Sequence, residues 1–197
     1  GTVARLQVRH PGADRLHRWL EGVSPVNLDR QVVPGTWTMR QLVLHVLDSD
    51  LAAGHRMKRI AAEPTPLLIA YDETAFAQSL YADIDVHLAA ELFRQHREHT
   101  SAILRGLPEE AFSRIGIHSQ RGKITLSEMI HLYVHHLDHH EPFAQAKRKA
   151  MGLDASSTAH THDWRERMMN AAVQDLRELT KANPHQGPET RPNTGTK

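Results

Sequence analysis

Apolar residues recur at intervals of three and four positions over four long stretches of the chain. This interval is the period of an amphipathic helix that turns one face toward a core. The predicted helices cover residues 14–23, 37–62, 85–104 and 125–150. No stretch of comparable length alternates strictly between apolar and polar residues, so the pattern predicts an all-α domain.

The second and fourth predicted helices both begin with a capping box. Thr38 is followed three residues later by Gln41, and Thr125 is followed in the same way by Glu128. Pro142 lies inside the fourth predicted helix. Because a proline there removes one hydrogen bond and clashes with the preceding turn, we expect a kink or bulge at this position.

Three connecting segments differ in their character. Residues 24–35 contain two prolines and are expected to form a loop. Residues 64–83 are long for a connection, and we expect them to contain a short helix over 72–80 and to lie over one end of the helices. Residues 112–124 have no helical period and include an S-Q-R-G turn, which predicts a small hairpin or an irregular segment.

The fourth predicted helix contains a dense histidine cluster. Residues 131–140 read H-L-Y-V-H-H-L-D-H-H and include five of the 16 histidines. At about 100° per residue, His136 and His140 fall on the apolar arc one turn apart, and this spacing lets one helix give two ligands to one metal. A hydrogen-bonded core pair is the alternative, but burying two unpaired polar rings is costly. The other three face outward and are expected on the surface: His131, His135 and His139.

A third metal ligand has to come from another part of the chain. Our candidate is His45, in the second predicted helix. That helix is apolar over a wide arc, and His45 lies at the edge of the arc. Periodicity alone therefore does not select His45 over His55, His96 or His99.

The order of several motifs resembles that of the DinB superfamily. These motifs are Trp37-Thr38 before the helix with His45, Tyr71-Asp72-Glu73 in the connection, and L-Y-V-x-H-x-x-x-H at 132–140. Over residues 14–152 the chain is most similar to the YfiT-like branch, which contains metal-dependent hydrolases and bacillithiol transferases. The resemblance implies a four-helix bundle that binds one divalent metal ion, zinc or nickel, through His45, His136 and His140.

A site with three neutral imidazoles favours activation of a nucleophile. Such ligands leave the +2 charge of a metal uncompensated and leave a coordination position open, which acidifies a bound water or thiol. The resemblance puts transfer of a low-molecular-weight thiol to an electrophile first. Hydrolysis of an ester, amide or lactone is the alternative. A non-catalytic, stress-related metal-binding bundle, closed by a fourth ligand such as Glu73 or His55, and a purely structural helical module are further alternatives.

Four more residues are candidates for the reaction itself. Asp72 and Glu73 are expected to reach the metal from the connecting loop, with one of them as general base. Arg56 and Tyr71 are expected to orient a small-molecule substrate, and Arg56 is favoured because the resembled branch has a matching arginine.

Composition excludes several other functions. Lys and Arg number 24 against 23 for Asp and Glu, and a net charge of +1 gives no electrostatic case for nucleic acid or a membrane surface. The chain has no cysteine, so disulfides and thiolate ligands are excluded and any reacting thiol must be a small molecule. No apolar run approaches the roughly 20 residues of a transmembrane helix. With no secretory signal visible, we expect a cytoplasmic protein.

The domain organisation has three parts. Residues 1–152 are expected to form the metal-binding bundle, and residues 153–182 a helical extension. The apolar stripe of this extension suggests packing on the bundle or on a second subunit, and we expect a homodimer. Residues 183–197 are rich in Pro, Gly, Thr and Asn and are expected to be disordered.

Overall fold

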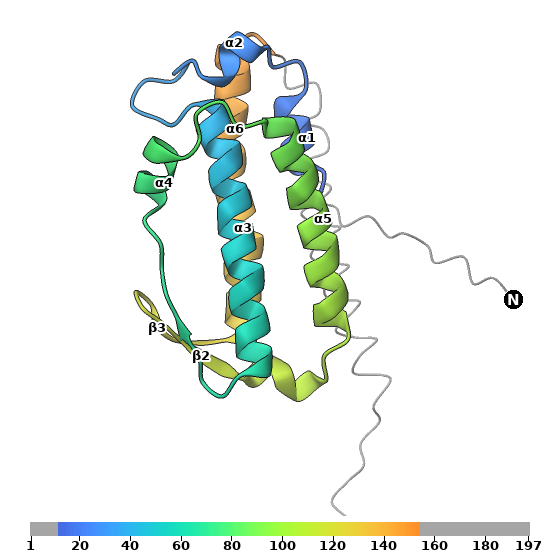
Figure 1. Ribbon diagram of the computed structural model, residues 1–197. Coiled ribbons are helices and arrows are strands. Elements are labelled where there is room, and N and C mark those ends of the chain that lie inside the picture. Colours follow the sequence, from blue (N-terminus) through green and yellow to red (C-terminus); the bar gives the residue numbers. More distant parts are fainter. Residues whose placement is uncertain (1–11, 154–197) are drawn as a thin grey trace, which may run out of the picture. The chain divides into compact units, whose positions relative to one another are not determined.

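The computed structural model describes residues 12–153 of the 197-residue chain. Three long helices, α3, α5 and α6, run along the length of the bundle, and the short helix α1 packs on α5 and α6 (Figure 1). Among the long helices, α3 contacts both α5 and α6. The bounds of these four helices are α1 (Arg15–Leu20), α3 (Met39–Ala62), α5 (Val86–Arg105) and α6 (Leu126–Ala150). The predicted all-α bundle is confirmed. The predicted helical extension over 153–182 and the tail over 183–197 lie outside the described residues, except at Leu153.

Short elements complete the domain. They are α2 (Pro25–Leu28), β1 (Leu67–Leu68), α4 (Glu73–Ser79), the 3-10 helix η1 (Glu109–Ser113), β2 (Ile115–His118) and β3 (Gly122–Thr125). The hairpin predicted within 112–124 is present as β2 and β3. The loop predicted over 24–35 is wrong in part, because α2 forms one helical turn there with Pro25 at its first position, where a missing N–H costs nothing.

The predicted helix starts are those found in the structure. The amide of Gln41 donates to the Thr38 hydroxyl at 3.2 Å, and the amide of Thr38 donates to the Gln41 side chain at 2.9 Å. Thr125 and Glu128 form the same reciprocal pair at the start of α6. Each box satisfies two amides that have no partner within the helix, and this fixes the helical phase of the histidines that follow.

Helix α6 continues through Pro142. It is a single α-helix over 25 residues with this proline inside it, so the predicted kink or bulge does not interrupt the helix. The histidines before the proline and the apolar residues after it therefore keep one helical phase.

The segment over 64–83 lies along α3 and not over the end of the bundle, which corrects the prediction (Figure 1). At one end, β1 pairs in parallel with β2, and β2 pairs in an antiparallel sense with β3. At the other end, the Gln41 side chain of α3 donates to the Ala77 carbonyl of α4 at 3.1 Å. Both anchors hold this segment against the side of α3, and we call it the strap.

Buried apolar side chains form two clusters along the bundle. The first joins α1, the start of α3, α5 and the later part of α6, and it includes Trp19, Leu42 and Phe93. The second joins the end of α3, the sheet and the start of α6, and it includes Ile60 and Met129. Polar side chains of α3, α5 and α6, among them Asp50, His96 and His140, pack beside these clusters, and we call them the polar layer.

One part of this polar layer ties α3 to α5. The carboxylate of Asp50 contacts His96 Nδ1 at 2.7 Å and accepts from Arg97 Nε at 2.8 Å. Gly54 makes the close approach of His96 possible, because a Cβ at this position would lie 2.5 Å from two atoms of the imidazole ring. The glycine inside α3 thus has a packing role.

We predict that Gly54→Ala destabilises the protein. In an exposed helix interior this change stabilises by about 1 kcal/mol, but the overlap with His96 should reverse the sign and cost about 1–3 kcal/mol. Urea unfolding measures the difference. In a His96→Ala background the two 2.5 Å contacts are removed and Thr100 Oγ1 stays close, at 3.0 Å, so Gly54→Ala should then destabilise much less. A stabilising effect in the wild-type background would contradict the tight contact.

Candidate metal centre

Three histidine rings converge in the polar layer between α3 and α6. His45 comes from α3, and His136 and His140 come from successive turns of α6. The three Nε2 atoms lie 3.3 Å (His45 to His136), 3.1 Å (His45 to His140) and 3.0 Å (His136 to His140) apart. The side chains of His45 and His140 are only 1% and 8% exposed.

The donor set fits a divalent metal ion. Nitrogens bound at about 2.0–2.1 Å are separated by about 3.3–3.4 Å around a tetrahedral ion and by about 2.9 Å around an octahedral one. The distances of 3.0–3.3 Å lie between these limits. A neutral imidazole carries one N–H, so three facing Nε2 atoms cannot all be satisfied by one another. A cation at their centre accepts all three lone pairs.

Burial keeps the three rings in the form that binds metal. Desolvation, strengthened by the neighbouring imidazoles, lowers the pKa of His45 and of His136 from 6.5 to about 4. The same causes lower the pKa of His140 to about 3. All three rings are therefore neutral at pH 7, and their lone pairs are available without the release of a proton.

The environment of His45 fixes its orientation. The Trp37 ring packs against it with 4.7 Å between centroids. On its other edge, His45 Nδ1 has no hydrogen-bond partner within the described residues, and the Glu73 carboxylate lies 3.9 Å away. A small movement would bring this carboxylate into the position in which metal-bound histidines usually have an acceptor for their second nitrogen.

A cavity of about 90 Å³ adjoins the cluster, and we call it the inner cavity. His136 is part of its wall, so the cluster opens onto it. The other wall residues come from α3, the strap, the β2–β3 hairpin and α6. They are Ser49, Arg56, Ala70, Tyr71, Glu73, His118, Gln120, Arg121, Leu132 and Tyr133.

Three of the four predicted reaction residues line the inner cavity. Glu73 is half exposed, and burial raises the pKa of its carboxyl group while Arg56 and Arg121 oppose this shift. The Tyr71 hydroxyl lies 2.9 Å from Ser49 Oγ. Burial raises the pKa of Tyr71 to about 12, so its hydroxyl stays protonated near neutrality.

Arg56 and Asp72 differ in their relation to the cavity. Arg56 donates to the Tyr133 hydroxyl and to the Ile69 carbonyl, each at 2.7 Å, which holds the guanidinium in the wall. Asp72 is exposed and accepts from the Ala75 amide at 2.9 Å as the N-cap of α4. The carboxylate of Asp72 is therefore used at the helix start and is not part of the cavity wall.

Sequence reasoning missed several wall residues. Tyr133 precedes His136 by three positions and so shares its face of α6, which is the signal that could have marked it. His118 and Arg121 lie in the hairpin, where no periodic signal marks them. The candidates that competed with His45 are placed elsewhere: His55 and His99 are exposed, and His96 contacts Asp50. The three outward histidines of α6 are exposed, as predicted.

The sequence matches the DinB superfamily over residues 11–141. The chain belongs to the DinB superfamily. YfiT of Bacillus subtilis is named as an inferred metal-dependent hydrolase. It is 32% identical to this chain over 151 residues, which cover 75% of this chain and 84% of YfiT. A relative from Oceanobacillus iheyensis with the same functional name is 28% identical over 113 residues, covering 57% and 66% of the two chains.

Solved structures support the same DinB fold. The YfiT structure, described as an unusual four-helix bundle, superposes with a TM-score of 0.68 at 29% identity and covers 73% of this chain and 83% of YfiT. A mycothiol-dependent maleylpyruvate isomerase superposes with a TM-score of 0.51 at 20% identity, covering 75% and 58%, which shows a shared fold. Within residues 12–153, no helix combines the length and the hydrophobicity needed to cross a bilayer.

We predict that each of the three clustered histidines is required for metal retention. Protein purified without an affinity tag should contain about one zinc or nickel ion per chain, as three converging histidine ligands imply. Alanine at position 45, 136 or 140 should abolish it. His135→Ala, on the exposed face of the same helix, is the matched control and should leave the metal content unchanged. Elemental analysis decides, and equal metal content in all variants would contradict the assignment.

A second prediction concerns acid stability after removal of metal by a chelator. Between pH 6.5 and 4 the unfolded chain protonates these rings while the folded chain does not, so stability falls as the pH falls through this window. At pH 5 the loss should be about 1–2 kcal/mol for each ring relative to pH 7. Urea unfolding at both pH values measures it. His140→Gln should reduce the difference, and an unchanged difference would contradict it.

Proposed function

We propose that this chain is a metal-dependent enzyme in which His45, His136 and His140 hold one divalent ion beside a substrate cavity. The observation that carries the proposal is the position of His136. Its ring belongs to the three-nitrogen cluster and also to the wall of the inner cavity. A small molecule in this cavity therefore lies next to the place where the metal would bind.

The ligand set determines the chemistry. A divalent ion held by three uncharged imidazoles lowers the pKa of a bound water or thiol toward neutrality and polarises a carbonyl group. The wall residues then have separate tasks. Glu73 accepts a proton, Tyr71 donates a hydrogen bond, and Arg56 binds and orients the substrate.

Glu73 is the best-placed general base. Its carboxylate lines the inner cavity and lies 3.9 Å from His45. Partial burial raises its pKa, which brings the carboxyl group closer to the range in which a general base is effective near neutral pH. The adjacent Asp72 accepts from the Ala75 amide instead, so we assign the proton transfer to Glu73 alone.

Hydrolysis of a small ester, amide or lactone is the first candidate reaction. The carboxylate beside the cluster supports it, because water has to lose a proton during attack, and so does the name of the YfiT relative. Transfer of a low-molecular-weight thiol is the second candidate. Three neutral ligands favour a bound thiolate, and the resembled branch includes such transferases. The chain has no cysteine, so the thiol would be a co-substrate.

The experiment compares two panels of substrates on zinc-loaded and nickel-loaded protein. One panel contains chromogenic esters, anilides and lactones. The other contains small thiols with an electrophile, and mass spectrometry detects the adduct. Turnover that needs metal and is lost in His136→Ala supports the enzyme. The panel that reacts identifies the nucleophile, and no turnover in either panel with metal bound would favour a non-catalytic metal protein.

We predict that Glu73→Gln lowers kcat by about 10²–10⁴-fold, the usual contribution of a general base. Metal content should remain near the wild-type level, because Glu73 is not one of the three ligands and the glutamine amide oxygen can still accept a hydrogen bond from His45 Nδ1. Asp72→Asn is the matched control. Asparagine caps a helix as well as aspartate, so activity should be nearly unchanged. Equal losses in both variants would contradict the assignment of the base to Glu73.

The homodimer and the cytoplasmic location stay predictions. Analytical ultracentrifugation of the full chain, beside a chain ending at residue 152, would test whether the C-terminal extension pairs two subunits.

A further inference from the structure

A second, larger cavity lies beside the inner one, between α3 and the strap. It has a volume of about 500 Å³, and we call it the outer cavity. The two cavities share two wall residues, Arg56 and Tyr71. The inner cavity, at about 90 Å³, is smaller than most ligand pockets, which occupy about 300–1,000 Å³. The inner cavity alone therefore holds only a small ligand, and the outer cavity is the neighbouring space for the rest of a larger one.

Arg56, at this junction, is a buried cation. Its side chain is 7% exposed, and its two hydrogen bonds go to neutral acceptors, the Tyr133 hydroxyl and the Ile69 carbonyl. A guanidinium has five N–H donors. Within residues 12–153, no carboxylate lies within 4.0 Å of Arg56. By contrast, Arg15 pairs with Asp138 at 2.7 Å, and Arg97 pairs with Asp50 at 2.8 Å.

The rest of the inner wall adds positive charge. Arg121 from the β2–β3 turn lines the same cavity, and Glu73 is the single carboxylate among the wall residues. The bound metal ion of the proposed function would add two further charges. Glu73 is the nearest compensation for Arg56 and Arg121 in this wall, but its carboxylate forms no ion pair with Arg56. Because a buried cation with no carboxylate at bonding distance is costly, this junction favours a ligand that brings a negative charge.

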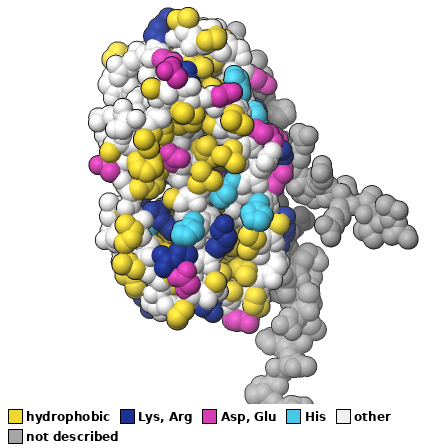
Figure 2. Space-filling model, in the orientation of Figure 1, with side chains coloured by type: hydrophobic (Ala, Val, Ile, Leu, Met, Phe, Trp, Pro, Cys, Tyr) yellow, Lys and Arg dark blue, Asp and Glu magenta, His cyan; other side chains and the backbone are white. Residues whose placement is uncertain are grey.

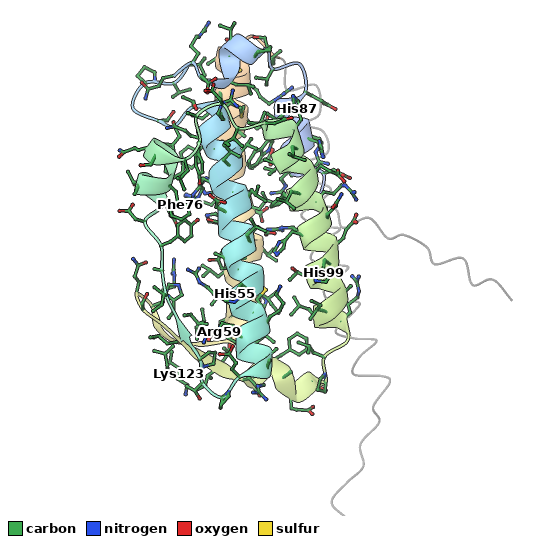
Figure 3. The ribbon with its side chains drawn as sticks, viewed as in Figure 1. His55, Arg59, Phe76, His87, His99 and Lys123 are labelled. Atoms are coloured by element: carbon green, nitrogen blue, oxygen red, sulfur yellow. The ribbon has the colours of Figure 1, made fainter. Side chains whose placement is uncertain are left out.

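The outer cavity offers a different environment. Leu51, Leu68, Ile69 and Phe76 give it a largely apolar wall. Asp48 also lines it, and its carboxylate accepts from the Tyr81 hydroxyl at 2.6 Å. Figure 3 shows Phe76 on the strap side and His55 and Arg59 along α3. In Figure 2, basic and histidine side chains gather on the lower half of this face. The charge of Arg59 is already compensated, because its guanidinium donates to the Glu63 carboxylate at 2.6 Å.

We propose that the substrate is a small amphipathic anion, a carboxylate or a phosphate with an apolar body. Its anionic group binds Arg56 at the junction, its apolar body lies in the outer cavity, and its reacting end enters the inner cavity beside His136. This inference rests on the proposed function and adds the substrate class. Tyr71, between the two cavities, is a positioning residue for the substrate.

The test uses the full-length, metal-loaded protein and three probes of similar shape. These are 3-phenylpropionate, phenyl phosphate and the neutral 3-phenylpropionamide, each measured by calorimetry. The wild type should bind at least one anion tenfold or more tightly than the amide, and the anion preferred distinguishes a carboxylate from a phosphate substrate. Equal affinity for all three probes would overturn the proposal.

Variants assign the anion to Arg56. Arg56→Met should abolish the preference for anions, and Arg56→Lys should restore part of it. Arg121→Gln, at an exposed position that tolerates substitution, should weaken anion binding severalfold. Arg105→Gln removes the same charge far from both cavities and should have no effect. Circular dichroism verifies folding, and an anion preference that survives in a folded Arg56→Met variant would overturn the proposal.

Two further measurements separate this inference from the metal assignment. According to the proposed function, His45→Ala lacks metal, and the preference for anions should persist in this variant. If the preference is instead lost in His45→Ala and survives in Arg56→Met, the anion binds the metal and the proposal is overturned. Ala52→Trp narrows the outer cavity and should weaken 3-phenylpropionate binding tenfold without changing acetate binding. Elemental analysis of the same samples tests the proposed function independently.

Discussion

The burial of three imidazole rings between α3 and α6 is the constraint on which the rest of this structure depends. Two hydrophobic clusters hold the helices together, and the polar layer beside them has to be satisfied largely by its own contacts. In one part of this layer Asp50 joins His96 and Arg97. In the other part, the Nε2 atoms of His45, His136 and His140 face one another, and the Glu73 carboxylate lies 3.9 Å from His45 Nδ1. Burial of these rings costs free energy of folding when no cation is bound, and a cation at their centre would offset this cost. Folding would then be coupled to metal binding.

The same desolvation has opposite effects on the two kinds of titratable group around the cluster. It lowers the pKa of the histidines, which stay neutral and able to bind metal, and it raises the pKa of Glu73, which becomes a better base near neutral pH. The buried guanidinium of Arg56, which donates to the Tyr133 hydroxyl and the Ile69 carbonyl, lies in the wall of the same cavity. Neutral imidazoles, a carboxylate and a guanidinium thus lie within one small region of the bundle.

The strap forms one wall of both cavities beside the three histidines. Pairing of β1 with β2 fixes one end, and the contact of Gln41 with Ala77 fixes the other. Between these anchors, Tyr71 and Glu73 are brought to the side of α3, and the space left between strap and helix forms the outer cavity. The hairpin contributes Arg121 from the opposite direction. The inner cavity therefore has walls from the strap and the hairpin as well as from α3 and α6, whereas the three clustered histidines lie on α3 and α6 alone.

The sequence by itself determined the helices, their capping boxes, the hairpin and the inward phase of His136 and His140, because all of these depend on residues a few positions apart. Only the tertiary structure decided which distant histidine completes the cluster. His45 is 91 positions from His136, and the wide apolar arc of α3 gives it no distinct phase. The path of the strap, the different placements of Asp72 and Glu73, and the buried position of Arg56 also required the structure. The physical reason is that periodicity records how a segment faces a core, whereas these features depend on which segments meet there.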